Sequence, residues 1–152
     1  MKASLRPKIS VHNRQRKLAI SRDELERFAE RALSLCLRER SRGPSLTSLN
    51  EVQVLLISDR RISEIHHRYM EIKGPTDVIT FQHGEIFISV ETALRQAQAY
   101  RTTLGHELNL YLVHGLLHLQ GFDDRSPAER RRINLVQTKI VARTSAGRRL
   151  NR

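Results

Sequence analysis

Two histidines four positions apart, followed by a glycine and a pair of aspartates, constrain this chain more than any other feature. The segment reads His114-Gly-Leu-Leu-His118-Leu-Gln-Gly121-Phe-Asp123-Asp124. Side chains four residues apart on a helix project from the same face, so the two imidazoles can bind one metal ion. Gly121 can end that helix, because glycine tolerates the left-handed backbone of a helix C-terminus. The chain can then return Asp124 to the same point, giving two nitrogens, one carboxylate oxygen and a fourth position for water, as in a catalytic zinc site.

The histidine pair alone also has a purely structural explanation. The helix that carries it is otherwise apolar, and two core histidines with satisfied hydrogen bonds would fit it equally well. The carboxylate that returns after Gly121 favours the metal site over this alternative.

The residue after the first histidine argues against a protease. A zinc protease of the His-Glu-x-x-His type carries a glutamate there as general base. This chain carries Gly115, which cannot accept a proton. A metal ion can still lower the pKa of a bound water without that glutamate, so hydrolysis of another substrate class stays open.

Positive charge is concentrated at the two ends of the chain. Of the formal net charge of +11, residues 1–17 carry +6 and residues 125–152 carry +8, which leaves −3 for residues 18–124. Basic ends around a mildly acidic centre suit a polyanion, and nucleic acid is the leading candidate. Solvated tails that serve solubility are the alternative. Candidate RNA-binding residues in these ends include Arg14, Arg16, Lys17, Arg130 and Arg131.

Length, apolar patterning and cysteine content indicate a soluble cytoplasmic protein. The 152 residues are enough to bury a core, and no stretch approaches the roughly 20 apolar residues of a membrane span. The first residues lack the apolar region of a secretory signal. The single cysteine, Cys36, lies among leucines, so we expect a buried thiol in a reducing compartment.

The hydrophobic periodicity predicts one α+β domain over residues 1–152. Ser21 and Ser126 are the expected caps of the first and last helices, and Asp59 that of a short helix that turns Tyr69 inward. Strands are expected at 8–12, 52–57, 77–81 and 85–89, and helices at 21–40, from 59, at 90–101, at 104–120 and from 126. The expected architecture is therefore a small central mixed sheet of about four strands with about five helices. The basic ends, 1–7 and 144–152, are candidates for mobile segments.

The segment from His114 to Asp124 closely resembles the signature of the YbeY family, the bacterial endoribonucleases and rRNA maturation factors. That signature reads His-Gly-x-x-His-Leu-x-Gly-Tyr-Asp-His. Upstream, Gly74-Pro-Thr-Asp-Val-Ile-Thr-Phe81 resembles the family block Pro-Thr-Asp-Val-Leu-Ser-Phe, and Glu85-Ile-Phe-Ile-Ser89 resembles the strand that follows it. The resemblance implies an α+β fold, one zinc ion, and cleavage of single-stranded RNA in maturation of 16S rRNA, notably at its 3′ end. It also implies ribosome quality control in contact with the small subunit.

The third metal ligand departs from the family pattern. The family has histidine where this chain has Asp124. A carboxylate can complete the site, with zinc as the expected ion and another divalent metal as the alternative. Asp123 is the alternative third ligand, or a hydrogen-bond partner of a ligand, and the register favours Asp124. Asp77 either accepts a hydrogen bond from the second nitrogen of a ligand or caps the strand that it precedes.

A second departure concerns the substrate phosphate. The resemblance implies an arginine six residues before the threonine of the Pro-Thr-Asp block, and this chain has Met70 there. Arg68 is the nearest substitute, although on a helix its side chain would point about 200° away from that of residue 70.

Two functions account for these features. In the first, the chain is a metal-dependent endoribonuclease: His114, His118 and Asp124 hold the ion, whose open position carries water or a phosphate oxygen. In the second, it is a non-catalytic ribosome-assembly factor with a structural metal, whose basic ends bind rRNA; the missing arginine at position 70 favours this alternative. RNA binding should weaken steeply with salt in both cases.

Overall fold

The computed structural model describes residues 6–40, 43 and 45–150, and this part of the chain forms four strands and five α-helices. The elements are β1 (Lys8–Asn13), α1 (Arg22–Cys36), β2 (Glu51–Ile57), α2 (Asp59–Met70), β3 (Val78–Phe81), β4 (Glu85–Ser89), α3 (Val90–Tyr100), α4 (Leu104–Leu119) and α5 (Pro127–Leu150), with a short 3-10 turn at Leu46–Ser48. The predicted α+β fold is confirmed.

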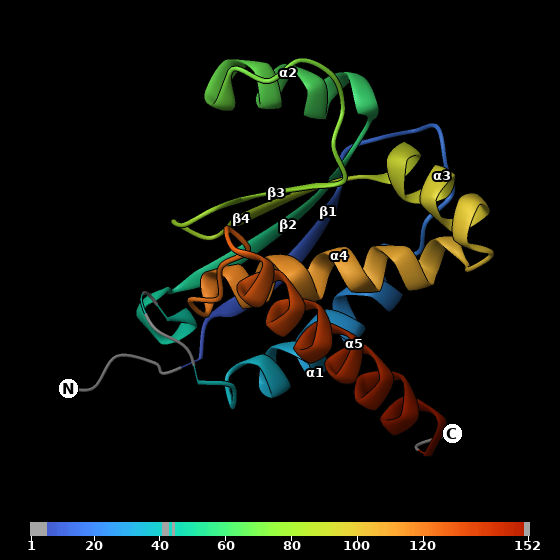
Figure 1. The fold of residues 1–152 in the computed structure, drawn as a ribbon. Coiled ribbons are helices and arrows are strands. Elements are labelled where there is room, and N and C mark those ends of the chain that lie inside the picture. The colour runs from blue at the N-terminus through green and yellow to red at the C-terminus, as the bar shows by residue number, and fades with distance from the viewer. Residues whose placement is uncertain (1–5, 41–42, 44, 151–152) are drawn as a thin grey trace.

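The four strands form one mixed sheet in the order β1-β2-β4-β3. β1, β2 and β4 are parallel, whereas β3 runs antiparallel to β4 at the edge. Parallel neighbours need crossover connections, and α1 and α2 lie within those connections. Figure 1 shows α2 on one face of the sheet and α1, α4 and α5 on the other, with α3 beyond one end.

Each face of the sheet has its own apolar core. Successive side chains of a strand point to opposite faces, so Val54 and Leu56 of β2 join the larger cluster under α1, α4 and α5, while Leu55 and Ile57 join the smaller cluster under α2. Helix α4 is buried over most of its surface and forms the centre of the larger cluster. The histidine pair therefore belongs to the most central helix of the fold.

The predicted caps of the first and last helices are confirmed. The Ser21 hydroxyl accepts a hydrogen bond from the Glu24 N–H at 3.2 Å. At α5 the Ser126 hydroxyl accepts from the Glu129 N–H, and the Glu129 carboxylate accepts from the Ser126 N–H, at 3.1 and 3.0 Å. This reciprocal pair is a complete capping box.

Helix α2 differs from its prediction in two details. Ser58 caps it, because the Ser58 hydroxyl accepts from the Arg61 N–H, whereas the Asp59 carboxylate accepts bonds from side chains of β4 and α3. Tyr69 does not turn into the core and is 60% exposed. The Tyr69 ring packs edge-on against Phe81 of the edge strand β3, with 5.4 Å between the two ring centroids.

Helix α1 ends at Cys36 and not near Arg40. The N–H groups of Arg38 and Glu39 bond to carbonyls three residues back, which tightens and ends the helix. Cys36 is fully buried, as predicted, and burial raises the pKa of its thiol.

Parts of the two basic ends lie outside the described residues, namely 1–5 and 151–152. Arg6 donates hydrogen bonds to the Ser34 hydroxyl and the Glu30 carbonyl, and α5 continues through Leu150. Among the helices that the structure describes, none has the length and apolar character needed to span a membrane.

Candidate metal centre

A glycine-based turn ends α4 directly after the histidine pair. Gly121 has a φ of 101°, in the left-handed region that glycine tolerates. Its N–H donates to the His118 carbonyl at 3.0 Å, and the Phe122 N–H donates to the Leu117 carbonyl at 2.9 Å. These two bonds form the Schellman pattern, and the turn brings the following residues back beside the helix.

Close packing of α4 on the sheet requires Gly115. A Cβ atom at this position would lie 2.7 Å from Cγ2 of Ile86 on β4, inside the normal contact distance between carbon atoms. The residue that argued against a protease therefore also has a packing function. It lets the helix that carries both histidines lie directly against the central strands.

The side chains of His114, His118 and Asp124 converge on one point. The two Nε2 atoms are 3.0 Å apart, and Oδ2 of Asp124 lies 3.6 Å from the first and 3.4 Å from the second. In a tetrahedral zinc site with bonds of about 2.0–2.1 Å, neighbouring ligand atoms lie about 3.3 Å apart. The three residues meet the spacing of a metal site, and they are the one such group of three or more among the described residues.

The second nitrogen of each imidazole is held by a specific partner. Nδ1 of His114 lies 2.8 Å from the side-chain oxygen of Gln137 on α5, and Nδ1 of His118 lies 3.1 Å from the Phe122 carbonyl. Both rings therefore direct Nε2 toward the common point. Hydrogen bonds of this kind orient metal-binding histidines and fix their tautomers.

The electrostatic surroundings keep His114 neutral. Burial is the largest influence and lowers the pKa of His114, and the adjacent His118 lowers it further. The bond to Gln137 and the carboxylates of Asp124 and Asp77 act in the opposite direction without reversing the result. Only a neutral imidazole can bind a metal ion, so the lowered pKa suits the residue to that task.

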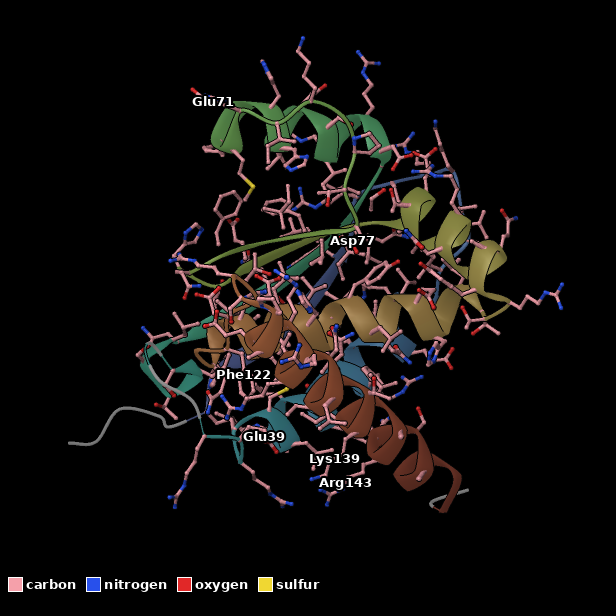
Figure 2. All side chains as sticks on the ribbon, in the orientation of Figure 1. Glu39, Glu71, Asp77, Phe122, Lys139 and Arg143 are labelled. Atoms are coloured by element: carbon pink, nitrogen blue, oxygen red, sulfur yellow. The ribbon has the colours of Figure 1, made fainter. Side chains whose placement is uncertain are left out.

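The two other aspartates near the site have local partners. Oδ1 of Asp123 accepts from the Asp124 N–H at 2.8 Å and its Oδ2 pairs with Arg125, whereas the Asp124 carboxylate lies close enough to both imidazoles to be a third donor. Asp77 lies between the start of β3 and α4 (Figure 2). Its carboxylate accepts from the Val78 N–H at 2.8 Å, which is the strand-capping alternative, and the ligand nitrogens bond to other groups.

The structure does not bring Arg68 to the histidine pair. Arg68 belongs to α2, across the sheet from α4 (Figure 1), and its guanidinium lies 5.6 Å from the ring centroid of Tyr69. Met70, the last residue of α2, is 42% exposed.

The candidate RNA-binding residues fall into two separate groups. Arg14, Arg16 and Lys17 follow β1, and Lys17 pairs with Glu91 of α3 at 3.4 Å. Arg130 and Arg131 lie in the first turns of α5, where Arg130 donates to the Asp124 carbonyl at 3.3 Å. The second group is thus the one that adjoins the metal centre.

Gln137 is the residue of the site that sequence reasoning missed. It lies on α5 in a row of buried apolar residues, four positions after Ile133 and three before Ile140. A single amide within such a row is a signal that could have been noticed, because a buried polar group needs a partner. Nothing in the local sequence identifies that partner. The Phe122 carbonyl, being backbone, leaves no signal at all.

The fold and the site define a small α+β protein with a His-His-Asp group at the end of its central helix that could hold a metal ion. Comparison with known proteins identifies the class more closely: the family model described as Endoribonuclease YbeY matches residues 10–145. The chain belongs to the YbeY family. The resemblance seen in the sequence motifs is thereby confirmed, over a longer stretch than those motifs covered.

Individual relatives agree with this assignment. A protein from Anaeromyxobacter named Endoribonuclease YbeY is 39% identical over 101 residues, which is 60% of this chain but only 53% of that relative. One of the same name from Gluconobacter oxydans is 34% identical over 122 residues, covering 76% of this chain and 71% of the relative. A solution structure of a Thermotoga maritima protein is similar, with a TM-score of 0.65 and 25% identity over 94% of this chain and 93% of that one.

Proposed function

We propose that this chain is a zinc-dependent endoribonuclease that cleaves single-stranded RNA. The observation that carries the proposal is the convergence of three metal-binding atoms, 3.0 to 3.6 Å apart, in a chain of the YbeY family. The donor set of two imidazoles and a carboxylate suits zinc, and leaves a position where a water or a substrate oxygen can bind.

The residues of the site have distinct tasks in this proposal. His114, His118 and Asp124 hold the ion, while the Phe122 carbonyl keeps the His118 ring in place. The ion supplies Lewis acidity, which lowers the pKa of water and stabilises negative charge on a phosphodiester. Arg130 fixes the backbone of the loop that carries Asp124.

The proposed substrate is the precursor of 16S rRNA, cut near its 3′ end, with a role in ribosome quality control in contact with the small subunit. Positive charge next to the site supports an RNA substrate. Arg125, Arg130 and Arg131 follow Asp124 within seven residues, whereas Lys139 and Arg143 extend from the side of α5 that faces away from the sheet (Figure 2). Because bacterial ribosomes are assembled in the cytoplasm, the proposal also places the protein there.

A cleavage assay on matched RNAs tests the proposal. The wild type and a His114→Ala/His118→Ala variant are purified, their zinc is measured by elemental analysis, and each is incubated with a single-stranded RNA and with the same sequence in a duplex. We expect zinc in the wild type only, and cleavage of the single strand that chelator abolishes. Equal cleavage by both proteins would refute the proposal. A wild type that binds zinc and RNA without cleaving would support the non-catalytic assembly factor instead.

A further inference from the structure

Gln137 is a polar side chain in a row of α5 that is otherwise apolar and buried. Its neighbours in the buried row of α5, Ile133, Ile140 and Val141, pack into the main core, and Gln137 itself is only partly exposed. A polar side chain in such a position loses part of its hydration and is destabilising unless it finds a hydrogen-bond partner. The bond to Nδ1 of His114 at 2.8 Å supplies the partner and joins two segments 23 residues apart in the sequence.

The hydrogen bonds define where each imidazole carries its proton. A carbonyl oxygen can only accept, so Nδ1 of His118 must donate to the Phe122 carbonyl. In the structure Gln137 directs its amide oxygen at Nδ1 of His114, and in this orientation of the amide Nδ1 of that ring donates as well. A neutral imidazole carries one proton. Both Nε2 atoms are therefore acceptors in the neutral rings.

These acceptors face one another with no donor between them. The two Nε2 atoms are 3.0 Å apart, and Oδ2 of Asp124, a third acceptor, lies 3.4 Å from Nε2 of His118. Lone pairs at this spacing repel unless a cation lies among them. The arrangement is favourable for a metal ion and unfavourable without a cation.

The other tautomer of His114 would remove this requirement. With its proton on Nε2, His114 would donate across the same 3.0 Å to Nε2 of His118, and the pair would be satisfied without a metal ion. That tautomer turns a lone pair toward Gln137, where the amide oxygen is also an acceptor. While the amide oxygen of Gln137 faces Nδ1, it disfavours the self-satisfied state; a 180° rotation of the amide, which Gln137→Glu excludes, would present the NH2 group instead.

We propose that Gln137 is a positioning residue that holds His114 in the Nδ1-protonated tautomer, and so keeps three acceptor atoms directed at the metal position. The inference rests on the metal centre of the proposed function, but not on RNA cleavage. It can therefore be tested without RNA.

The test compares the full-length wild type with Gln137→Leu, which removes the acceptor, and Gln137→Glu, which keeps one. Asn134→Leu, an exposed change one turn earlier on α5, is the matched control. Zinc affinity is measured by competition with a chromophoric chelator. The tautomer of His114 is read in the metal-free proteins from long-range proton–nitrogen NMR correlations, at a pH where both imidazoles are neutral.

We expect Nδ1 of His114 to carry the proton in the wild type, and Nε2 to carry it in Gln137→Leu. Zinc affinity should fall about 10–100-fold in Gln137→Leu and should be retained in Gln137→Glu and in the control. If Gln137→Leu does not fold, Gln137→Met serves as the second apolar variant, and the wild-type tautomer alone still decides the first expectation.

Two results would overturn the role of Gln137: an Nε2-protonated His114 in the metal-free wild type, or zinc affinity in the folded apolar variant within about twofold of the wild type. A wild type that binds no zinc would refute the metal centre, and with it both this inference and the proposed function. Zinc binding that depends on Gln137, in a protein that cleaves no RNA, would refute the proposed activity and leave the inference intact.

Discussion

The contact between Gly115 and the sheet leads to a quantitative prediction for Gly115→Ala. The added Cβ would lie 2.7, 2.8 and 3.0 Å from three side-chain carbons of Ile86, which is fully buried. Carbon atoms pack at about 3.5–4.0 Å, so the helix or the Ile86 side chain must move by roughly 0.7 Å or more. Overpacking of this kind costs about 1–3 kcal/mol, whereas alanine gains up to about 1 kcal/mol over glycine in a helix.

A second glycine of the same helix separates these two effects. Gly105 lies near the start of α4, is exposed, and has no atom within 4 Å of the position that its Cβ would take. Gly105→Ala should therefore be neutral or stabilising. We expect Gly115→Ala to be less stable than Gly105→Ala by about 1–3 kcal/mol, which corresponds to about 2–12 °C in Tm for a chain of this size.

Urea unfolding of both variants measures the difference, and zinc titration of each measures its effect on the site. Because His114 precedes Gly115 directly, a shifted helix should also weaken zinc binding. A Gly115→Ala protein as stable as Gly105→Ala would refute the tight contact. Combining Gly115→Ala with Ile86→Ala is a further check, because the new methyl group enters the space that Ile86 vacates. The double variant should be more stable, by about 0.5–3 kcal/mol, than the sum of the two single-variant effects predicts.

Four further predictions concern the site and its surroundings. Chelator should lower the Tm of the wild type in differential scanning fluorimetry and leave the Tm of the His114→Ala/His118→Ala variant unchanged, because an ion that binds only the folded state stabilises that state. Equal Tm shifts in the two proteins would place the ion elsewhere. Asp124→His, which restores the family ligand, should retain one zinc per chain by elemental analysis, whereas loss of zinc would show that the loop geometry demands a carboxylate. Met70→Arg should increase the rate of RNA cleavage at constant zinc content, and an unchanged rate would show that this position does not contact substrate. Burial would raise the pKa of Asp59, but hydrogen bonds from Arg95 and two hydroxyls outweigh it and hold the pKa below 3.8. The stabilisation from these bonds is present above the unfolded-state pKa and is lost as the pH falls through the folded-state pKa. In urea unfolding, the Asp59→Asn variant should therefore lose less stability below about pH 4 than the wild type does.

The sequence predicts the elements of this fold well because they depend on local patterns. The order of strands and helices follows from apolar periodicity. The end of α4 follows from Gly121, and the start of α5 follows from the Ser126–Glu129 capping box. The metal-binding group is predictable for the same reason, since the spacing of a helix and one turn bring its three members together.

Features that depend on distant packing could not be predicted. Tyr69 fits the inward periodicity of α2, but its ring lies at the edge strand of the sheet and stays 60% exposed, and nothing within α2 indicates where the sheet ends. The Asp59 carboxylate accepts hydrogen bonds from side chains of β4 and α3 and does not cap its own helix. To predict the hydrogen bond between Gln137 and His114, one must know how α5 packs on α4, and the local sequence of neither helix contains that information.

All three metal-binding residues lie within the eleven residues from His114 to Asp124, and this has a kinetic consequence. Closing so short a loop costs little chain entropy, so binding of the ion depends mainly on the last two turns of α4 and the loop behind them. The Asp124 side chain is 43% exposed in the loop behind α4, and exposed loops open locally at a much lower free energy than buried helices. Exchange of the ion should therefore proceed through opening of the loop that carries Asp124, at a rate that scarcely responds to denaturant, while α4 and the rest of the molecule stay folded.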